Sequence, residues 1–155
     1  MAQDLDKLTQ EIQNSILAEE RKIYSEKVVE LFLNPKNLGQ IKDADGVGVV
    51  TGPCGDTTQI WLKVRDDKII QVRFLTDGCG PTISCGSMLT ELVKGINEVL
   101  KITPDELTLS LGGLPESHLH CSLLSVNTLR AAIRDYLASK REPWKRLYNV
   151  RKPSL

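Results

Sequence analysis

Three cysteines, Cys54, Cys79 and Cys121, lie at points where the 155-residue chain must leave regular structure. Cys54 and Cys79 are each followed by a glycine, which leaves room for a bulky metal centre to approach the backbone. Loops at the ends of helices and strands are also where binding sites are usually built. The cysteines are 25 and 42 residues apart, which matches no local zinc-finger or ferredoxin spacing. They therefore predict a metal or thiol site only if the fold brings them together.

Two neighbouring side chains could complete such a site. Asp56, two residues after Cys54, would hold iron less tightly than a fourth thiolate, or it only hydrogen-bonds its own turn. His120 adjoins Cys121 and is either an alternative ligand or an influence on the thiolate. Successive side chains on a helix point about 100° apart. On a helix, we therefore expect His120 and Cys121 not to meet the same metal ion readily.

The fourth cysteine, Cys85, has a different setting. It lies on the apolar stripe of a predicted helix, four residues before Leu89. Free cysteines often behave as small buried hydrophobes, so we predict a core position for Cys85. The alternative is a fourth thiol within reach of the Cys79 loop.

Hydrophobic periodicity predicts two helices at the start of the chain. The first is amphipathic, and the second begins after the N-cap Ser25 and stops at Asn34-Pro35. The apolar face of the first helix comprises Leu5, Leu8, Ile12 and Ile16.

The middle of the chain changes to the two-residue period of strands. Strands are predicted over residues 46–52, over residues 57–65, and where Ile70, Val72 and Phe74 alternate with polar residues. Because the connections between them are short, the three strands should form an antiparallel meander.

Helical periodicity then returns. One helix is predicted from Pro81 to Val99, and a capping box at residues 103–106 starts a short helix that Gly112-Gly113 ends. A last helix ends at Pro143 at the latest. Its apolar stripe comprises Val126, Leu129, Ile133 and Tyr136.

Grouped strands between helices predict an α+β fold: a three-stranded antiparallel sheet packed against helices, with an extra N-terminal helix and a basic C-terminal tail. We expect a helical extension at 1–23, a main domain at 24–139 and the tail at 140–155. The tail has six basic residues and one acidic residue, so it carries +5 and the rest of the chain −5. It either docks an acidic partner, with Trp144 and Tyr148 as anchors, or is a solvated terminus.

Composition excludes several classes of function. Twenty basic residues balance twenty acidic ones, which argues against a nucleic-acid-binding protein. No apolar run is long enough to span a membrane, and the first residues do not resemble a signal peptide. We therefore expect a cytoplasmic protein, where cysteines serve metals or catalysis more often than disulfides.

Four ordered motifs resemble the IscU/NifU-type scaffolds of iron–sulfur cluster assembly. The resemblance covers residues 24–136. Its motifs are Tyr-Ser-Glu-Lys-Val at residues 24–28 with Asn-Pro-Lys-Asn at 34–37, Pro-Cys-Gly-Asp at 53–56, Gly-Cys-Gly at 78–80, and Leu-His-Cys-Ser at 119–122.

The resemblance implies a scaffold rather than an enzyme, which builds a [2Fe–2S] cluster from iron and from sulfur supplied by a cysteine desulfurase. It implies that Cys54, Cys79 and Cys121 are ligands, that Asp56 ligates metal or labilises the cluster, and that Cys121 accepts persulfide sulfur. Acceptor apoproteins are implied partners, and a chaperone or an iron or electron donor is a further candidate. Zinc at the same residues and a homodimer that shares one cluster are also compatible with the resemblance.

The chain departs from the family pattern at residues 114–118. The family's chaperone-recognised Leu-Pro-Pro-Val-Lys is here Leu-Pro-Glu-Ser-His, which leaves dependence on such a chaperone open. Two other functions stand beside the scaffold: a structural zinc protein that uses the same residues, and an enzyme with Cys121 as nucleophile and a histidine as base.

Overall fold

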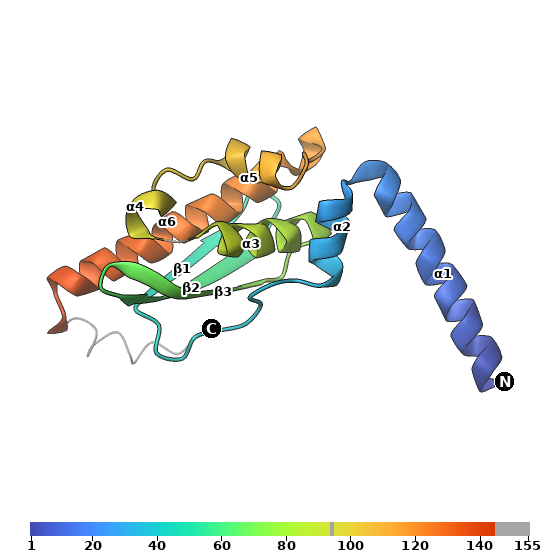
Figure 1. Cartoon of the computed structure of the whole chain (residues 1–155), viewed down its shortest axis with the longest axis horizontal. Helices are drawn as coiled ribbons and strands as arrows, with labels where there is room; N and C mark the ends of the chain where they lie inside the picture. The colour runs from blue at the N-terminus through green and yellow to red at the C-terminus, as the bar shows by residue number, and fades with distance from the viewer. Residues whose placement is uncertain (94, 145–155) are drawn as a thin grey trace.

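The sheet has three antiparallel strands in the order β1-β2-β3: β1 (Gly46–Thr51), β2 (Thr57–Arg65) and β3 (Lys68–Thr76). The computed structural model describes residues 1–93 and 95–144 (Figure 1). The β2–β3 turn consists of Asp66 and Asp67, both with positive φ, as expected for a two-residue hairpin. The predicted meander is confirmed, and β2 spans the predicted residues.

A β-bulge in β3 overturns one part of the predicted pattern. Lys63 pairs with Gln71 but Val64 pairs with Ile69, so Ile70 has no partner on β2. The extra residue reverses the alternation of side chains at that point. Ile69 is therefore buried and Ile70 is 53% exposed, whereas the sequence placed Ile70 on the face of Val72 and Phe74.

The two predicted N-terminal helices are confirmed as α1 (Ala2–Ile23) and α2 (Glu26–Leu33). The Ser25 hydroxyl accepts a hydrogen bond from the Val28 N–H and donates one to the Leu111 carbonyl, which ties the start of α2 to the end of α5. Helix α1 extends away from the sheet and the other helices (Figure 1), and none of its residues is buried.

The helix predicted from Pro81 to Val99 is instead two helices, α3 (Gly80–Leu92) and α4 (Ile96–Val99). Val93 and Gly95 both have extended backbones and therefore interrupt the helix. The capping box of Thr103 and Glu106 begins α5 (Pro104–Ser110), and Gly112 and Gly113 follow it with positive φ. A 3₁₀ turn (Glu116–His118) leads into α6 (Leu119–Arg141), as predicted.

Helices α3 and α6 cover one face of the sheet (Figure 1), and the core lies between them and the strands. Gly48 of β1 permits a close approach of α6. A Cβ at this position would collide with the Thr128 carbonyl oxygen and lie 2.5 Å from the Ala132 nitrogen. The backbone of α6 at Thr128 and Ala132 therefore rests directly on β1.

None of the helices in the described residues is long and apolar enough to cross a membrane. Residues 145–155, and with them Tyr148 and most of the basic tail, lie outside the described part of the chain. Trp144 is exposed. The division of the chain at residues 23 and 139 stays a prediction, and α6 continues past the second boundary to Arg141.

Candidate metal centre

The turn between β1 and β2 carries Cys54 and Asp56. Gly52 accepts a hydrogen bond from the Gly55 N–H and donates its own N–H to the Asp56 carbonyl, at 3.1 and 2.8 Å. Gly55 has a φ of +88°, a conformation that suits glycine. These bonds hold the turn tightly while the Cys54 side chain remains exposed.

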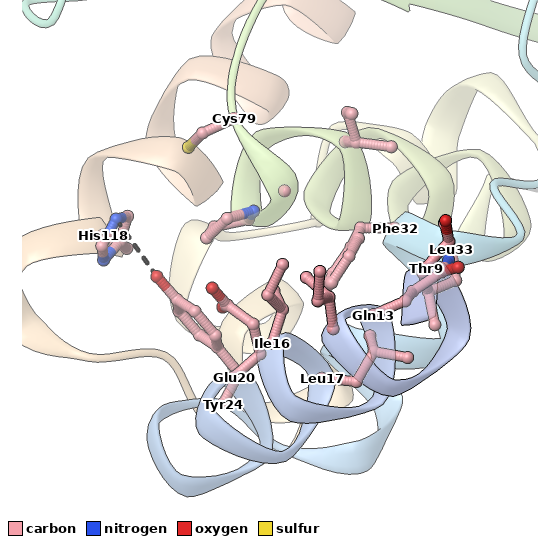
Figure 2. A pocket seen from close by; sticks show the side chains of 14 residues that line it. Thr9, Gln13, Ile16, Leu17, Glu20, Tyr24, Phe32, Leu33, Cys79 and His118 are labelled. Carbon is pink, nitrogen blue, oxygen red and sulfur yellow. Dashed lines mark hydrogen bonds between the residues drawn. The ribbon is translucent and has the colours of Figure 1, made fainter. Parts of the chain in front are cut away.

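Cys79 and Cys121 come from the starts of two helices. Cys79 is the N-cap residue of α3 and is exposed, whereas Cys121 lies in the first turn of α6 and is fully buried. Figure 2 shows Cys79 above the first turn of α3, on the same side as His118.

Thr82, which the sequence analysis did not identify, lies between three of the predicted ligands. Its hydroxyl oxygen is 3.1 Å from Asp56 Oδ2, 3.4 Å from Cys121 Sγ and 3.6 Å from Cys79 Sγ. The structure therefore brings together residues from the β1–β2 turn, α3 and α6. The only sequence signal was the position of Thr82, three residues after Cys79 at the start of a helix.

Gly78 leaves the space that the Asp56 carboxylate occupies. A Cβ at Gly78 would lie 2.7 Å from Asp56 Oδ2 and 2.7 Å from the Thr82 side chain. Real Cβ atoms do not approach other atoms so closely, so a side chain here would displace the carboxylate or Thr82.

Cys54 influences the same set of residues through its charge, which acts on the Cys121 thiol. Burial, together with the negative charges of Cys79, Cys54 and Asp56, raises the pKa of the Cys121 thiol to about 11, and the Thr82 hydrogen bond opposes this rise. Concentrated acceptor groups of this kind repel one another as anions, and a bound cation relieves the repulsion. Within residues 1–93 and 95–144, however, no three His, Cys, Asp or Glu side chains are already grouped closely enough to hold a metal ion.

His120 approaches the site more closely than helix geometry suggested. Its Nε2 lies 3.7 Å from Cys121 Sγ, although the expectation that the two side chains do not readily meet the same metal ion stays a prediction. The imidazole is long enough to turn back towards the sulfur in the first turn of α6. It also stacks on His118, with ring centroids 6.2 Å apart.

The family model of the NifU-like N-terminal domain matches residues 23–143. The chain belongs to this family. An iron–sulfur cluster assembly scaffold protein IscU from Archaeoglobus fulgidus is 50% identical over 117 residues, which cover 74% of this chain and 76% of that protein. The Escherichia coli protein of the same name is 42% identical over 126 residues, covering 77% and 97%.

Among solved structures, the N-terminal part of a NifU-like protein from Brucella abortus superposes with a TM-score of 0.58 at 22% identity. The match covers 75% of this chain and 95% of that one and supports the NifU-like fold. The predicted resemblance and the predicted fold are therefore both confirmed.

Within this NifU-like domain, His118 is the last residue of the segment at 114–118. Its Nδ1 lies 3.0 Å from the Ser117 hydroxyl, and its Nε2 lies 3.4 Å from the Tyr24 hydroxyl. The Tyr24 and His118 rings meet edge to face, with centroids 5.6 Å apart. The segment at 114–118 is thus connected through His118 to the junction of α1 and α2.

Cys85 is fully buried, as predicted. Its Sγ lies 3.7 Å from the Ser122 hydroxyl, which in turn lies 2.8 Å from the Thr108 hydroxyl. Burial raises the pKa of the Cys85 thiol to about 12. Its full burial among core residues supports the core role.

An apolar groove of about 620 Å³ borders the site. It lies between α1, the end of α2 and the start of α3, and Cys79 and His118 form one end of it (Figure 2). Ile16 and Leu17 of α1 face Phe32 of α2 across this groove. A molecule bound there would contact the exposed Cys79 side of the NifU-like domain.

Proposed function

We propose that this protein is a scaffold on which iron–sulfur clusters are assembled and from which they pass to acceptor apoproteins. One observation carries the proposal: a chain up to 50% identical to scaffold proteins named IscU brings Asp56, Cys79 and Cys121 around one buried hydroxyl. The cluster is cargo in this function, so the protein acts as a carrier and not as an enzyme.

The proposed ligands of a [2Fe–2S] cluster are Cys54, Cys79 and Cys121. The fourth position would be taken by Asp56 or His120. A carboxylate binds iron less tightly than a thiolate, so ligation by Asp56 leaves one edge of the cluster easier to release. Two of the cysteines lie on exposed segments, from which the cluster could be handed to another protein.

Sulfur would come from the persulfide of a cysteine desulfurase, with Cys121 as acceptor. In this exchange the Cys121 thiolate attacks the outer sulfur, a new S–S bond forms on Cys121, and the desulfurase cysteine leaves as a thiolate. Reduction of that sulfur to sulfide needs two electrons from a separate electron donor. Because Cys121 is fully buried, the neighbouring side chains must move before a persulfide can reach it.

Anaerobic reconstitution with Fe²⁺, cysteine and a cysteine desulfurase tests the proposal. We expect visible absorption typical of a [2Fe–2S] cluster, its loss in Cys54→Ala, and its retention in the matched Cys85→Ala variant. If Asp56 labilises the cluster and does not ligate it, Asp56→Ala should release the cluster more slowly than the wild type. A colourless protein that keeps stoichiometric zinc throughout would instead identify a zinc protein using the same residues.

Two finer features of the proposal concern partners. Three cysteines leave one ligand position open, so two copies of the chain could share one cluster. Size-exclusion chromatography of the apo and reconstituted protein would show this as a cluster-dependent change in mass.

The substituted segment at 114–118 is proposed to weaken chaperone dependence. Cluster release measured with and without an Hsp70-type chaperone tests this proposal.

A further inference from the structure

Thr82 offers no atom that iron prefers as a ligand, yet it occupies the centre of the candidate site. Its side chain is fully buried, and its hydroxyl lies within 3.6 Å of Asp56, Cys79 and Cys121. These three residues belong to the β1–β2 turn, the N-cap of α3 and the first turn of α6. The Thr82 hydroxyl thus contacts one residue from each of these three segments.

The chemistry of a hydroxyl limits what Thr82 can do. It has one proton to donate and two lone pairs to accept with. The shortest of the three contacts, at 3.1 Å, runs to the Asp56 carboxylate, which can only accept. Hydrogen bonds to an ionised acceptor are the stronger kind, so the Thr82 proton is best placed on Asp56. The thiol of Cys79 can donate to the same oxygen, and Cys121 Sγ is a second acceptor within reach of the Thr82 proton.

Asp56 has few other restraints on its direction. It lies on a turn between two strands and is only partly buried, and the absence of a side chain at Gly78 makes room for its carboxylate beside Thr82. The Thr82 hydroxyl is the contact that turns this carboxylate towards Cys121 and Cys79, because it touches all three groups.

We propose that Thr82 is a positioning residue of the site, whose hydroxyl holds the Asp56 carboxylate where it can share a metal ion with Cys79 and Cys121. This inference rests on the proposed function, since it requires that these side chains bind metal. Partners that orient a metal ligand by a hydrogen bond typically account for about 10-fold to 100-fold in metal affinity. A comparable loss is expected when the hydroxyl is removed.

Anaerobic titration of the full-length apoprotein with Co²⁺ is the test, because thiolate-to-cobalt charge-transfer absorption reports ligation by sulfur without any cluster chemistry. Thr82→Val keeps the branched shape of the side chain and removes the hydroxyl, and Thr82→Ser keeps the hydroxyl. We expect Thr82→Val to bind Co²⁺ roughly 10-fold to 100-fold more weakly, with Thr82→Ser close to the wild type. If Thr82→Val does not fold, Thr82→Ala, which always fits the space, takes its place.

The double variant with Asp56→Ala separates positioning from a general structural effect. If Thr82 acts through Asp56, Thr82→Val should cost little additional affinity once Asp56 is already alanine. Equal losses in both backgrounds, no rescue by Thr82→Ser, or wild-type affinity in Thr82→Val would each overturn the inference. Absence of sulfur-to-cobalt absorption in the wild type would instead overturn the proposed metal site itself, so the two failures are distinguishable.

Discussion

Helices α1 and α6 have almost the same length, 22 and 23 residues, but opposite environments. Both carry an apolar stripe that is visible in the sequence. No residue of α1 is buried, whereas nine residues of α6 are, and α6 lies directly on β1. Both helices border the candidate site, because α6 carries Cys121 and α1 lines the groove that reaches Cys79.

The difference shows that an apolar stripe predicts a helix but not what covers it. The stripe of α6 faces a sheet in the same chain, and close packing fixes its position. The stripe of α1 remains exposed at Leu5, Leu8, Ile12 and Ile16, each more than half accessible. The candidate site consequently has one rigid side, at Cys121, and one open side, at Cys79.

The largest expected effect comes from separating α6 from β1. Gly48→Ala places a Cβ against the backbone of Thr128 and Ala132. We expect it to lower the free energy of unfolding by about 2–3 kcal/mol, or roughly 4–12 °C in melting temperature. Val49→Ala, on the exposed face of the same strand, is the control and should cost less than about 1 kcal/mol. Equal melting temperatures for the two variants would contradict the close contact.

The second prediction compares the thiols on the two sides of the site. In the apoprotein at pH 8, iodoacetamide should modify Cys121 at least about tenfold more slowly than Cys79, because Cys121 is buried and its pKa is raised to about 11. Mass spectrometry of peptides from a time course measures both rates. In urea the difference should disappear. Equal rates in the folded protein would mean that the α6 side opens as readily as the α1 side.

A smaller effect is expected at the far end of α6. Lys140 and Tyr136 hydrogen-bond to Asp67 in the β2–β3 turn and lower the pKa of its carboxyl group. A lowered pKa stabilises the fold above the carboxyl's ordinary value of about 3.9, and this contribution is lost as the pH falls through the folded-state value.

Asp67→Asn should therefore melt slightly below the wild type at pH 6 and together with it near pH 2. Denaturation followed by circular dichroism at both pH values measures the two differences. If the melting temperatures of Asp67→Asn and the wild type still differed near pH 2, the charge on Asp67 would not be the cause of the difference.

The smallest effect is expected on α1. Changing both Leu5 and Leu8 to serine should alter the free energy of unfolding by no more than about 0.5 kcal/mol, because both side chains are exposed. Chemical denaturation measures it. A loss as large as that of Gly48→Ala would show that α1 is packed in solution and would end the contrast with α6.

Much of the fold was predictable because its signals are local. The N-cap Ser25, the capping box of Thr103 and Glu106 and the period of β2 each depend on residues that are close in sequence, and all three are confirmed. The exposure of Ile70 was not predictable, because a bulge is defined by pairing with another strand. The division between α3 and α4 was hidden by an apolar stripe that continues across the extended residues Val93 and Gly95.

The candidate site was predictable in its residues but not in its centre. Cys54, Asp56, Cys79 and Cys121 stood out by residue type, and the first three also by neighbouring glycines; their roles as ligands remain a proposal. Thr82 had no such mark, because a threonine near the start of a helix is ordinary. Its contacts to Asp56 and Cys121 span 26 and 39 residues of sequence, and only the folded chain brings them together.

Gly78 affects the site through what it lacks. The volume that a side chain would fill is taken by the Asp56 carboxylate and by Thr82. Saturation mutagenesis would therefore find Gly78 as intolerant of replacement as the metal-binding residues, although Gly78 has no side chain that could bind metal. Intolerance to substitution alone therefore does not distinguish residues that bind the cluster from residues that only leave space for the binding side chains.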